Sequence, residues 1–405
     1  MERDENGVPQ GPDKSKPLMV LLVSVALAAL TPAGPLAPDQ QWSVTRDLLA
    51  TSSTAAAGTA PAVVHREQRM TTPKGPVTSD VVVADLRRVR ATLLTGRTVG
   101  QRATPQERAR AAGAVAAING DFFDFGRSNA PSGPSVQGGV ALTSPVPAGR
   151  RLAPGVPGDQ EGDALVIDKA GRARLDRLTL AGEVRGPRGS FPIRTLNAYA
   201  VPEGGIGILT PAWGDRDRNA TLCGTNTDRN APCPPDRTEV VVDGARVTAV
   251  REPGAGPIGP GQKILVGRDE GAWQLRRLRV GDSVVLHHRL VARSGASPRT
   301  AVGGSPILRG GRPVPGLDTR ARAPRSAAGI TRDGRLVLVT ADGRETTSVG
   351  VTLAETADLL RRAGAVDGVN LDGGGSSMLV YRGKVVNRPA GDAYRLVPNT
   401  LAIMN

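Results

Sequence analysis

Aromatic residues, cysteine and histidine are all scarce in this sequence. Aromatic residues make up 2% of 405 residues, and the chain has 2 Cys and 3 His. The hydrophobic core must therefore consist mainly of Val, Leu, Ile and Ala. Few aromatic residues also leave few surfaces on which bases could stack, so we expect no nucleic-acid partner despite a net charge of +14.

Several signatures of common enzymes are also missing. No Gly-x-Ser-x-Gly motif occurs, which argues against a serine hydrolase of that type. The three glycines at 373–375 are followed by neither a lysine nor a helical pattern, so they are not a nucleotide-binding P-loop. No block of Lys or Arg is longer than a pair. The positive charge therefore indicates either attraction to polyanions or a compositional habit of the chain.

The two cysteines, Cys223 and Cys233, have no nearby residues that would complete a zinc site. Such a pair predicts a disulfide that closes a short loop in an oxidising compartment.

The N-terminus predicts export. Lys14 and Lys16 precede an apolar run from Leu18 to Leu30, and small residues and prolines follow it. Because a bilayer span needs about 20 apolar residues, we interpret residues 1–31 as a signal peptide, with an uncleaved anchor as the alternative. Residues 32–75, rich in Ala, Thr, Ser and Pro, are expected to form a linker. The protein would be secreted or attached to the cell envelope, with membrane contact only through an uncleaved N-terminal segment.

The rest of the chain predicts an α+β fold. The 51 Gly and 33 Pro indicate many turns, and hairpin patterns occur at 164–175 and 239–250. Two helices are expected, at 104–117 and 352–364, because each begins with a capping box. We predict a mixed, mostly antiparallel set of strands with a few helices in one large domain, 76–405, in which 150–300 could form a β-rich subdomain.

The segment Asn370–Ser377 reads as the end of a strand, a glycine loop and the start of another strand. Asp372 supplies a carboxylate that could act as acid, base or nucleophile, while the amides of Gly373–Gly375 and the hydroxyls of Ser376 and Ser377 could bind an anion. The alternative is a hairpin whose Asp and Ser bond to their own turn. Three glycines and two serines exceed what a turn requires, so we favour a functional site.

A second polar segment, Asn119–Asp124, follows the first predicted helix. Its amide and its two carboxylates, Asp121 and Asp124, could bind a hard cation or serve acid–base chemistry. The alternative is a turn at a strand end with Phe122 and Phe123 in the core. Adjacent residues of a strand point to opposite faces, so one phenylalanine is expected to face a ligand. No cofactor is predicted, although a cation near Asn119, Asp121 and Asp124 stays an alternative.

Together, these stretches resemble the phosphodiester glycosidase family. The resemblance covers about residues 78–405 and rests on motifs at 117–123, 209–214, 302–306, 324–330, 370–377, 386–389 and 395–399. Two positions depart from the family pattern. Asp121 stands where relatives usually have a second Gly, and Ser326 stands where they usually have Thr.

The resemblance implies hydrolysis of a sugar 1-phosphodiester at the anomeric bond, on a phosphate-bearing wall or capsular glycan. Asp372 would act on the sugar side, and Arg325 and Arg395 would neutralise the phosphate. The expected catalytic residues are Asp372, Arg325 and Asp121. The expected substrate-binding residues are Asn119, Gly304, Ser305, Ser326, Asn370, Gly373, Gly374, Gly375, Ser376, Ser377 and Arg395. A non-catalytic module that binds anionic envelope glycans is the alternative.

Overall fold

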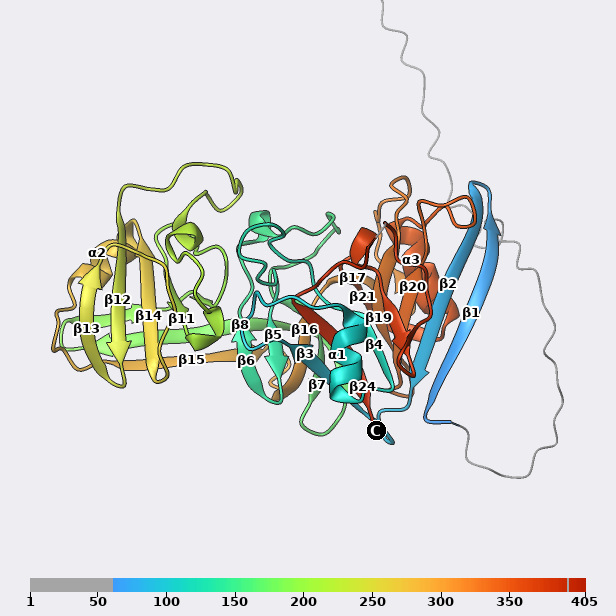
Figure 1. The fold of residues 1–405 in the computed structure, drawn as a ribbon, viewed down its shortest axis with the longest axis horizontal. Coiled ribbons are helices and arrows are strands. Elements are labelled where there is room, and N and C mark those ends of the chain that lie inside the picture. The colour runs from blue at the N-terminus through green and yellow to red at the C-terminus, as the bar shows by residue number, and fades with distance from the viewer. Residues whose placement is uncertain (1–60, 392) are drawn as a thin grey trace, which may run out of the picture. The chain divides into compact units, whose positions relative to one another are not determined.

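Strands dominate the computed structural model, which describes residues 61–391 and 393–405. The described residues contain three α-helices and four sheets, and nearly all neighbouring strands are antiparallel (Figure 1). The predicted α+β fold in one large domain is therefore confirmed. The predicted signal peptide lies outside the described residues. Within them, no helix has the length and apolar character needed to cross a membrane.

The first sheet has the strand order β1-β2-β20-β19-β21-β17-β18. Its strands are β1 Val63–Thr72, β2 Gly75–Ala84, β17 Ser305–Arg309, β18 Arg312–Pro313, β19 Arg325–Thr331, β20 Leu336–Ala341 and β21 Ala365–Asn370. The order brings β21, which leads into the glycine loop, between β19 and β17.

The second sheet has the order β23-β22-β4-β24-β3. Its strands are β3 Arg90–Thr95, β4 Ala116–Asn119, β22 Leu379–Tyr381, β23 Lys384–Val385 and β24 Asn399–Met404. Strand β22, which follows the glycine loop, pairs with β4. The two polar segments singled out in the sequence thus adjoin two paired strands of this sheet.

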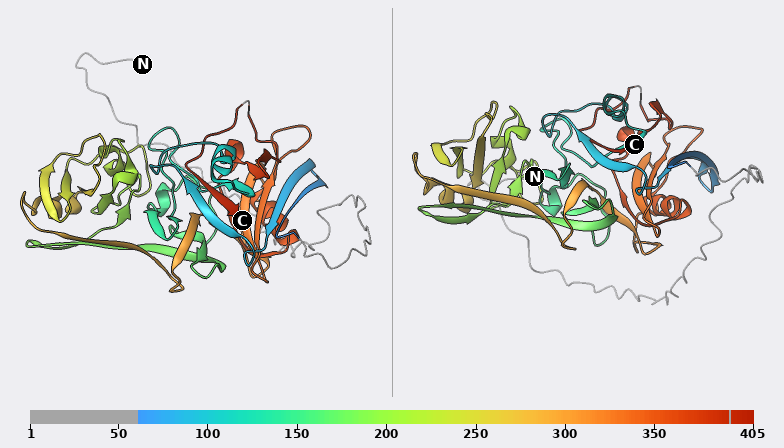
Figure 2. Two further views of the ribbon diagram at one scale, coloured as in Figure 1. Left: turned by 60° about the horizontal axis from the view of Figure 1, so that its bottom comes forward. Right: turned by 90° about the horizontal axis from the view of Figure 1, so that it is seen from below.

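The third and fourth sheets contain the middle of the chain. The third has the order β15-β8-β7-β16-β5-β6, with β9 paired to β8. Its strands are β5 Ser135–Gln137, β6 Val140–Thr143, β7 Asp163–Asp168, β8 Ala173–Gly186, β9 Gly189–Pro192, β15 Val285–Ala292 and β16 Pro298–Gly303. The fourth, β10-β11-β14-β12-β13, contains β10 Thr195–Leu196, β11 Ile206–Leu209, β12 Arg237–Asp243, β13 Arg246–Arg251 and β14 Gln262–Arg268. Figure 2 shows β8 and β15 as a long pair of strands.

The helices are short, and the two predicted ones begin at their predicted caps. They are α1 Pro105–Ala112, α2 Glu270–Arg276 and α3 Leu353–Arg362, and 3₁₀ turns occur at Ala148–Arg150, Pro211–Trp213, Asn219–Leu222 and Gly374–Ser376. Thr104 and Thr352 both form the predicted capping boxes. The first helix ends earlier than predicted, because Gly113 adopts a left-handed conformation (φ 67°) that closes it.

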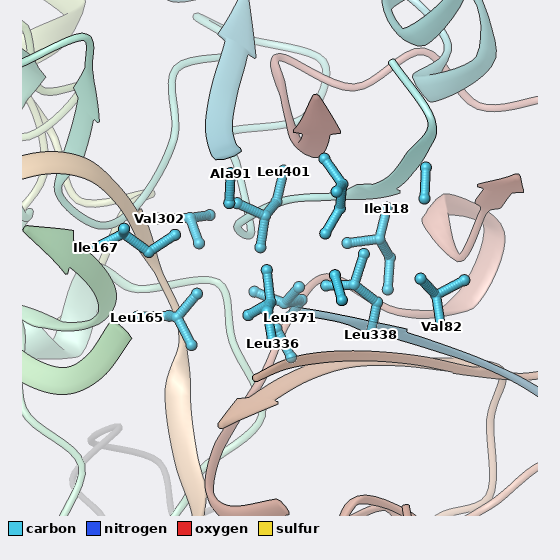
Figure 3. Packing of buried hydrophobic residues seen from close by; sticks show 14 of the residues in the cluster. Val82, Ala91, Ile118, Leu165, Ile167, Val302, Leu336, Leu338, Leu371 and Leu401 are labelled. Carbon is cyan, nitrogen blue, oxygen red and sulfur yellow. The ribbon is translucent and has the colours of Figure 1, made fainter. Parts of the chain in front are cut away.

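One apolar core joins three of the sheets (Figure 3). Val82, Leu338 and Leu371 come from the first sheet or its end, Ile118 from the second and Val302 from the third. As the composition requires, this core is aliphatic. Helix α3 covers the opposite face of the first sheet through Leu353, Ala357 and Leu360, among other residues. The joined sheets bring the ends of β4, β16, β19 and β21 together around the glycine loop.

The predicted linker boundary is wrong. Val63–Thr72, within the expected linker 32–75, forms the edge strand β1 and pairs with β2 along its whole length. His65, on this strand, bonds Asp80 with 2.7 Å between Nε2 and Oδ1. The folded part therefore begins before Pro76.

Candidate active site

Asn119 connects three segments at the centre of the candidate site. It is the last residue of β4 and is fully buried. Its side-chain nitrogen donates to the carbonyl of Asp372 (2.6 Å), and its side-chain oxygen accepts hydrogen bonds from the Ser326 hydroxyl (2.7 Å) and the Met378 N–H (3.1 Å). The amide thus ties β4 to β19 and to both sides of the glycine loop. Asn119 and Ser326, both predicted as substrate-binding residues, use these groups to hold the site together.

The backbone of the glycine loop is fixed at both of its ends. The Asp372 N–H donates to the carbonyl of Gly120 (3.0 Å), and the Gly374 N–H donates to the carbonyl of Pro324 (2.8 Å). Gly374–Ser376 then form one 3₁₀ turn before β22 begins. The predicted order of strand, glycine loop and strand is therefore correct, and the position of Asp372 is set by backbone contacts.

Asp372 has the electrostatics of a functional carboxylate. The residue is half-buried, but its carboxyl group is surrounded by protein, and this desolvation raises its pKa to about 7. Asp121 nearby raises the pKa further, whereas the Ser376 hydroxyl and the Arg395 charge lower it. Acids and bases with pKa values near neutrality are enriched at active sites. A large fraction of Asp372 would change protonation state around pH 7.

Asp121 is a second enclosed carboxylate. Its two oxygens accept hydrogen bonds from the N–H groups of Phe122 (2.8 Å) and Gly133 (2.6 Å), and the residue is 1% exposed. A Cβ at Gly303 would collide with Oδ2, so only glycine leaves room there. Burial raises the pKa of Asp121 to about 6, against the opposing influence of the Arg151 charge. Asp121 therefore organises the backbone and also acts on the charge of Asp372.

A partly buried ion pair that the sequence did not indicate, Arg151–Asp159, lies near Asp121. Arg151 donates to Asp159 (Nη1 to Oδ2, 2.7 Å), and the Ser305 hydroxyl donates to the same Asp159 oxygen (2.7 Å). The charges of Arg151 and Asp159 both influence the pKa of Asp121. Neither residue belongs to a recognisable motif, and only the fold places them here. Ser305, by contrast, was predicted.

Several buried polar atoms of the loop region have no hydrogen-bond partner among the residues that the structure describes. Asn370 is fully buried, and neither atom of its amide is bonded; the Ser377 hydroxyl is likewise unpaired. The Ser376 hydroxyl lies close enough to lower the pKa of Asp372, but it too meets no partner at full hydrogen-bond geometry. Because unpaired buried polar groups are costly, such a concentration is typical of a site that binds a ligand. Asn370, Ser376 and Ser377 were all predicted to bind substrate.

The two predicted arginines are placed differently. Arg325 is buried and donates to the carbonyls of Val351 (3.4 Å) and Ala321 (3.2 Å). Its burial lowers its pKa. Arg395 is exposed and lies over the loop, where a Cβ at Gly375 would come within 2.9 Å of its Nη2. Arg395 is therefore the more accessible of the two cations.

The remaining predicted features are Gly304 and the disulfide between the two cysteines. Gly304 donates its N–H to the carbonyl of Asp163 (3.2 Å), and a Cβ there would lie 3.0 Å from the carbonyl oxygen of Asn370. Cys223 and Cys233 form the predicted disulfide. Their loop includes Arg229, which pairs with Asp124 (2.9 Å). The disulfide loop therefore reaches the second polar segment.

Phe122 and Phe123 are both buried, at 6% and 5% exposure, and the expectation that one of them faces a ligand stays a prediction. Strand β4 ends at Asn119, and the alternation of a strand does not apply beyond it. The carboxylate of Asp124 binds Ser128 and Arg229, and that of Asp121 binds backbone amides. In the part of the chain that the structure describes, no three His, Cys, Asp or Glu residues are arranged to hold a metal ion.

Comparison with known proteins finds the family that the sequence motifs resemble. Residues 236–404 match the family model described as phosphodiester glycosidase. The resemblance to this family is confirmed over that range. The matched range includes Ser305, Arg325, the whole glycine loop and Arg395. The phosphodiester glycosidase match thus covers the candidate site except for Asn119–Asp124 and the Arg151–Asp159 pair.

Individual relatives are similar over shorter stretches. The SPbeta prophage-derived uncharacterized protein YomE of Bacillus subtilis (strain 168) is 38% identical over 86 residues, which are 21% of this chain and 13% of that protein. The N-acetylglucosamine-1-phosphodiester alpha-N-acetylglucosaminidase of Mus musculus is 42% identical over 66 residues, 16% of this chain and 13% of the enzyme. Each match therefore spans only a small part of the curated relative.

A solved structure extends the similarity to most of the fold. A Burkholderia pseudomallei K96243 protein, proposed to be exported, superimposes with a TM-score of 0.63 and 25% identity. The superposition covers 82% of this chain and 74% of that one. The strands before residue 236 therefore belong to the same architecture.

Proposed function

We propose that the protein is an exported glycosidase that hydrolyses a sugar 1-phosphodiester at the anomeric bond. The observation that carries the proposal is the carboxylate of Asp372, whose pKa is raised to about 7, at the head of a glycine loop over which Arg395 lies. Substrates of this class combine an anomeric carbon, which needs a carboxylate, with a phosphate, which needs cations and amide groups. The match to the phosphodiester glycosidase family supports the same chemistry.

In the proposed reaction, the oxygen of a water molecule bonds to the anomeric carbon as the bond from that carbon to the phosphate oxygen breaks. Asp372, in its carboxylate form, takes the proton of the water or stabilises the positive charge that develops on the sugar. The leaving group is a phosphate monoester, which is already acidic and needs little general-acid assistance. Burial is the main cause of the high pKa of Asp372, and the negative charge of Asp121 raises it further.

The substrate is proposed to be a phosphate-bearing glycan of the cell wall or capsule. The name of the mouse relative suggests N-acetylglucosamine as the sugar. Export is supported by the disulfide between Cys223 and Cys233 and by the proposed export of the Burkholderia protein.

The test is to incubate the protein with the methyl diester of N-acetylglucosamine 1-phosphate and to measure release of reducing sugar. Asp372→Asn should fold normally and lose activity by about three orders of magnitude or more. Asp333→Asn, an exposed carboxylate on the β19–β20 turn, is the matched control and should retain full activity. Full activity in Asp372→Asn would overturn the assignment. Binding of the diester without any release of sugar would instead support the non-catalytic binding module.

A further inference from the structure

The side chain of Arg344, which no sequence motif indicated, lies beside the glycine loop. It lies in the loop between β20 and α3 and has a backbone φ of 65°, in the left-handed region that few non-glycine residues adopt. The loop around it is well anchored. The Asp342 N–H donates to the carbonyl of Thr78 (2.9 Å), and the Ser348 hydroxyl donates to the carbonyl of Asp342 (2.7 Å). A left-handed backbone conformation at a non-glycine residue, with hydrogen bonds fixing the chain before and after it, is a feature often found at functional sites.

The guanidinium group of Arg344 lies beside Gly374. A Cβ at Gly374 would be 3.5 Å from Nη2 and 3.7 Å from Nη1 of Arg344, and Gly374 itself has a φ of 59°. The next residue, Gly375, has the guanidinium of Arg395 over it. Two guanidinium groups therefore lie over two successive glycines, one in ordinary van der Waals range of a Cβ at Gly374 and the other too close for a Cβ at Gly375.

A third cation lies close by. Arg325 is near enough to Arg344 that the Arg344 charge lowers its pKa, although burial is the larger cause. Among the described residues, none of these three arginines forms an ion pair with a carboxylate. Arg325 donates to backbone carbonyls, and Arg395 stacks on Phe125 at 5.2 Å from the ring centre. Arg322, a few residues before Arg325, instead pairs with Glu355 at 2.9 Å.

Three like charges around one loop repel each other unless an anion offsets them. Guanidinium groups bind phosphate through paired N–H donors. Arg325 has already committed part of its donors to the backbone, whereas Arg344 has no hydrogen bond or ion pair within the described structure. Among the described residues Arg344, like Arg395, thus has guanidinium donors that are free for a ligand.

We infer that Arg344 binds the phosphate group of the substrate and sets the preference for a phosphodiester over an uncharged leaving group. The inference rests on the proposed function, because the phosphate group belongs to the proposed substrate. It places that phosphate on the side of the loop where Arg344 and Arg395 lie. Asp372, at the head of the loop, would then face the sugar. Arg344 is a specificity-determining residue in this arrangement, and the reaction itself still depends on Asp372.

The experiment compares two substrates and four proteins. The substrates are the methyl diester of N-acetylglucosamine 1-phosphate and the uncharged 4-nitrophenyl N-acetyl-α-glucosaminide. The proteins are the wild type, Arg344→Gln, Arg344→Lys and the control Arg312→Gln. The control removes another exposed arginine that forms no ion pair within the described part of the chain. Arg344→Gln should lower kcat/KM for the diester about 30-fold or more and change that for the uncharged glycoside about twofold or less. Arg344→Lys should fall between the two, because it keeps the charge and loses the paired donors.

Calorimetric binding of N-acetylglucosamine 1-phosphate separates this inference from the proposed function. If the wild type binds this anion and Arg344→Gln binds it at least about tenfold more weakly, the assignment of Arg344 stands whether or not the diester is cleaved. If the wild type cleaves the diester and Arg344→Gln is unaffected in both assays, the role of Arg344 is refuted and the hydrolase remains. If the wild type neither binds nor cleaves, both proposals are wrong.

Discussion

Burial raises the pKa of Asp372 to about 7 and that of Asp121 to about 6. A carboxyl group whose pKa is higher in the folded chain than in the unfolded chain binds its proton more tightly when folded. The unfolded value is 3.8, so folding takes up protons at Asp372 between about pH 4 and pH 7. Stability contributed by this group is therefore greatest at low pH and is lost as the pH rises through about 7.

Asp372→Asn removes the reactive carboxyl group and, with it, the loss of stability that deprotonation of this group causes at high pH. We expect the variant to be more stable than the wild type at pH 8 by about 1–3 kcal/mol and nearly equal to it at pH 4. Urea unfolding at the two pH values measures the difference. Activity of the wild type should rise with pH through about 7, because the reaction uses the carboxylate form. A stability difference of the same size at both pH values would show that the pKa of Asp372 is not raised.

Among individual residues, the sequence predicted some members of the candidate site and could not predict others. Asp372 and Asn370 were predicted because they border three consecutive glycines, a local signal. Arg344 and Arg151 reach the site from loops distant in the chain, with no distinctive neighbours. Their contribution depends on where the loops after β20 and β6 run, and those paths are set by tertiary packing rather than by local sequence.

Among the elements, β4, β19 and the glycine loop are joined through one side chain. Asn119→Ala would remove the acceptor of the Ser326 hydroxyl and of the Met378 N–H, and the donor to the Asp372 carbonyl. Each buried group left without a partner costs about 1–3 kcal/mol, so we expect a loss of about 3 kcal/mol or more in the free energy of unfolding. Activity should fall as well, since the carbonyl of Asp372 loses its anchor.

Urea unfolding and the sugar-release assay together measure this effect. The matched control is Asn230→Ala, which removes an exposed asparagine that accepts one hydrogen bond from Arg127 (2.9 Å). It should change stability by about 0.5 kcal/mol or less. If the two variants lost similar free energies of unfolding, Asn119 would not be the side chain that joins β4, β19 and the glycine loop.

Element boundaries were predicted well where local chemistry determines them. Thr104 and Thr352 start their helices because each satisfies backbone N–H groups that any helix leaves free. Strand β1 was missed for the opposite reason. Residues His65 to Arg69 are all polar or charged, since β1 is an edge strand with one side in solvent. Its position depends on pairing with β2, which no local pattern records.

For the molecule as a whole, the net charge of +14 is spread over the sequence. Many of the described arginines pair with carboxylates, for example Arg218 with Glu239 at 2.6 Å. Arg344 and Arg395 form no such pairs with other described residues, and they mark one region where the excess charge can meet an anion. A long phosphoglycan would meet the general positive field as well as this region, whereas a small diester would mainly meet these arginines.

Salt should therefore affect the two substrates differently. Attraction between exposed charges is screened beyond about 10 Å at 0.1 M salt, while direct contacts between guanidinium and phosphate are screened less. Raising NaCl from about 20 mM to about 300 mM should increase KM for a polymeric phosphoglycan about tenfold, and KM for the methyl diester about threefold or less, with kcat unchanged for both. Steady-state kinetics over the salt series measures this. Equal increases for the two substrates would mean that the distributed charge of the chain has no part in capturing the polymer, and that its excess of arginine is a compositional feature unrelated to substrate binding.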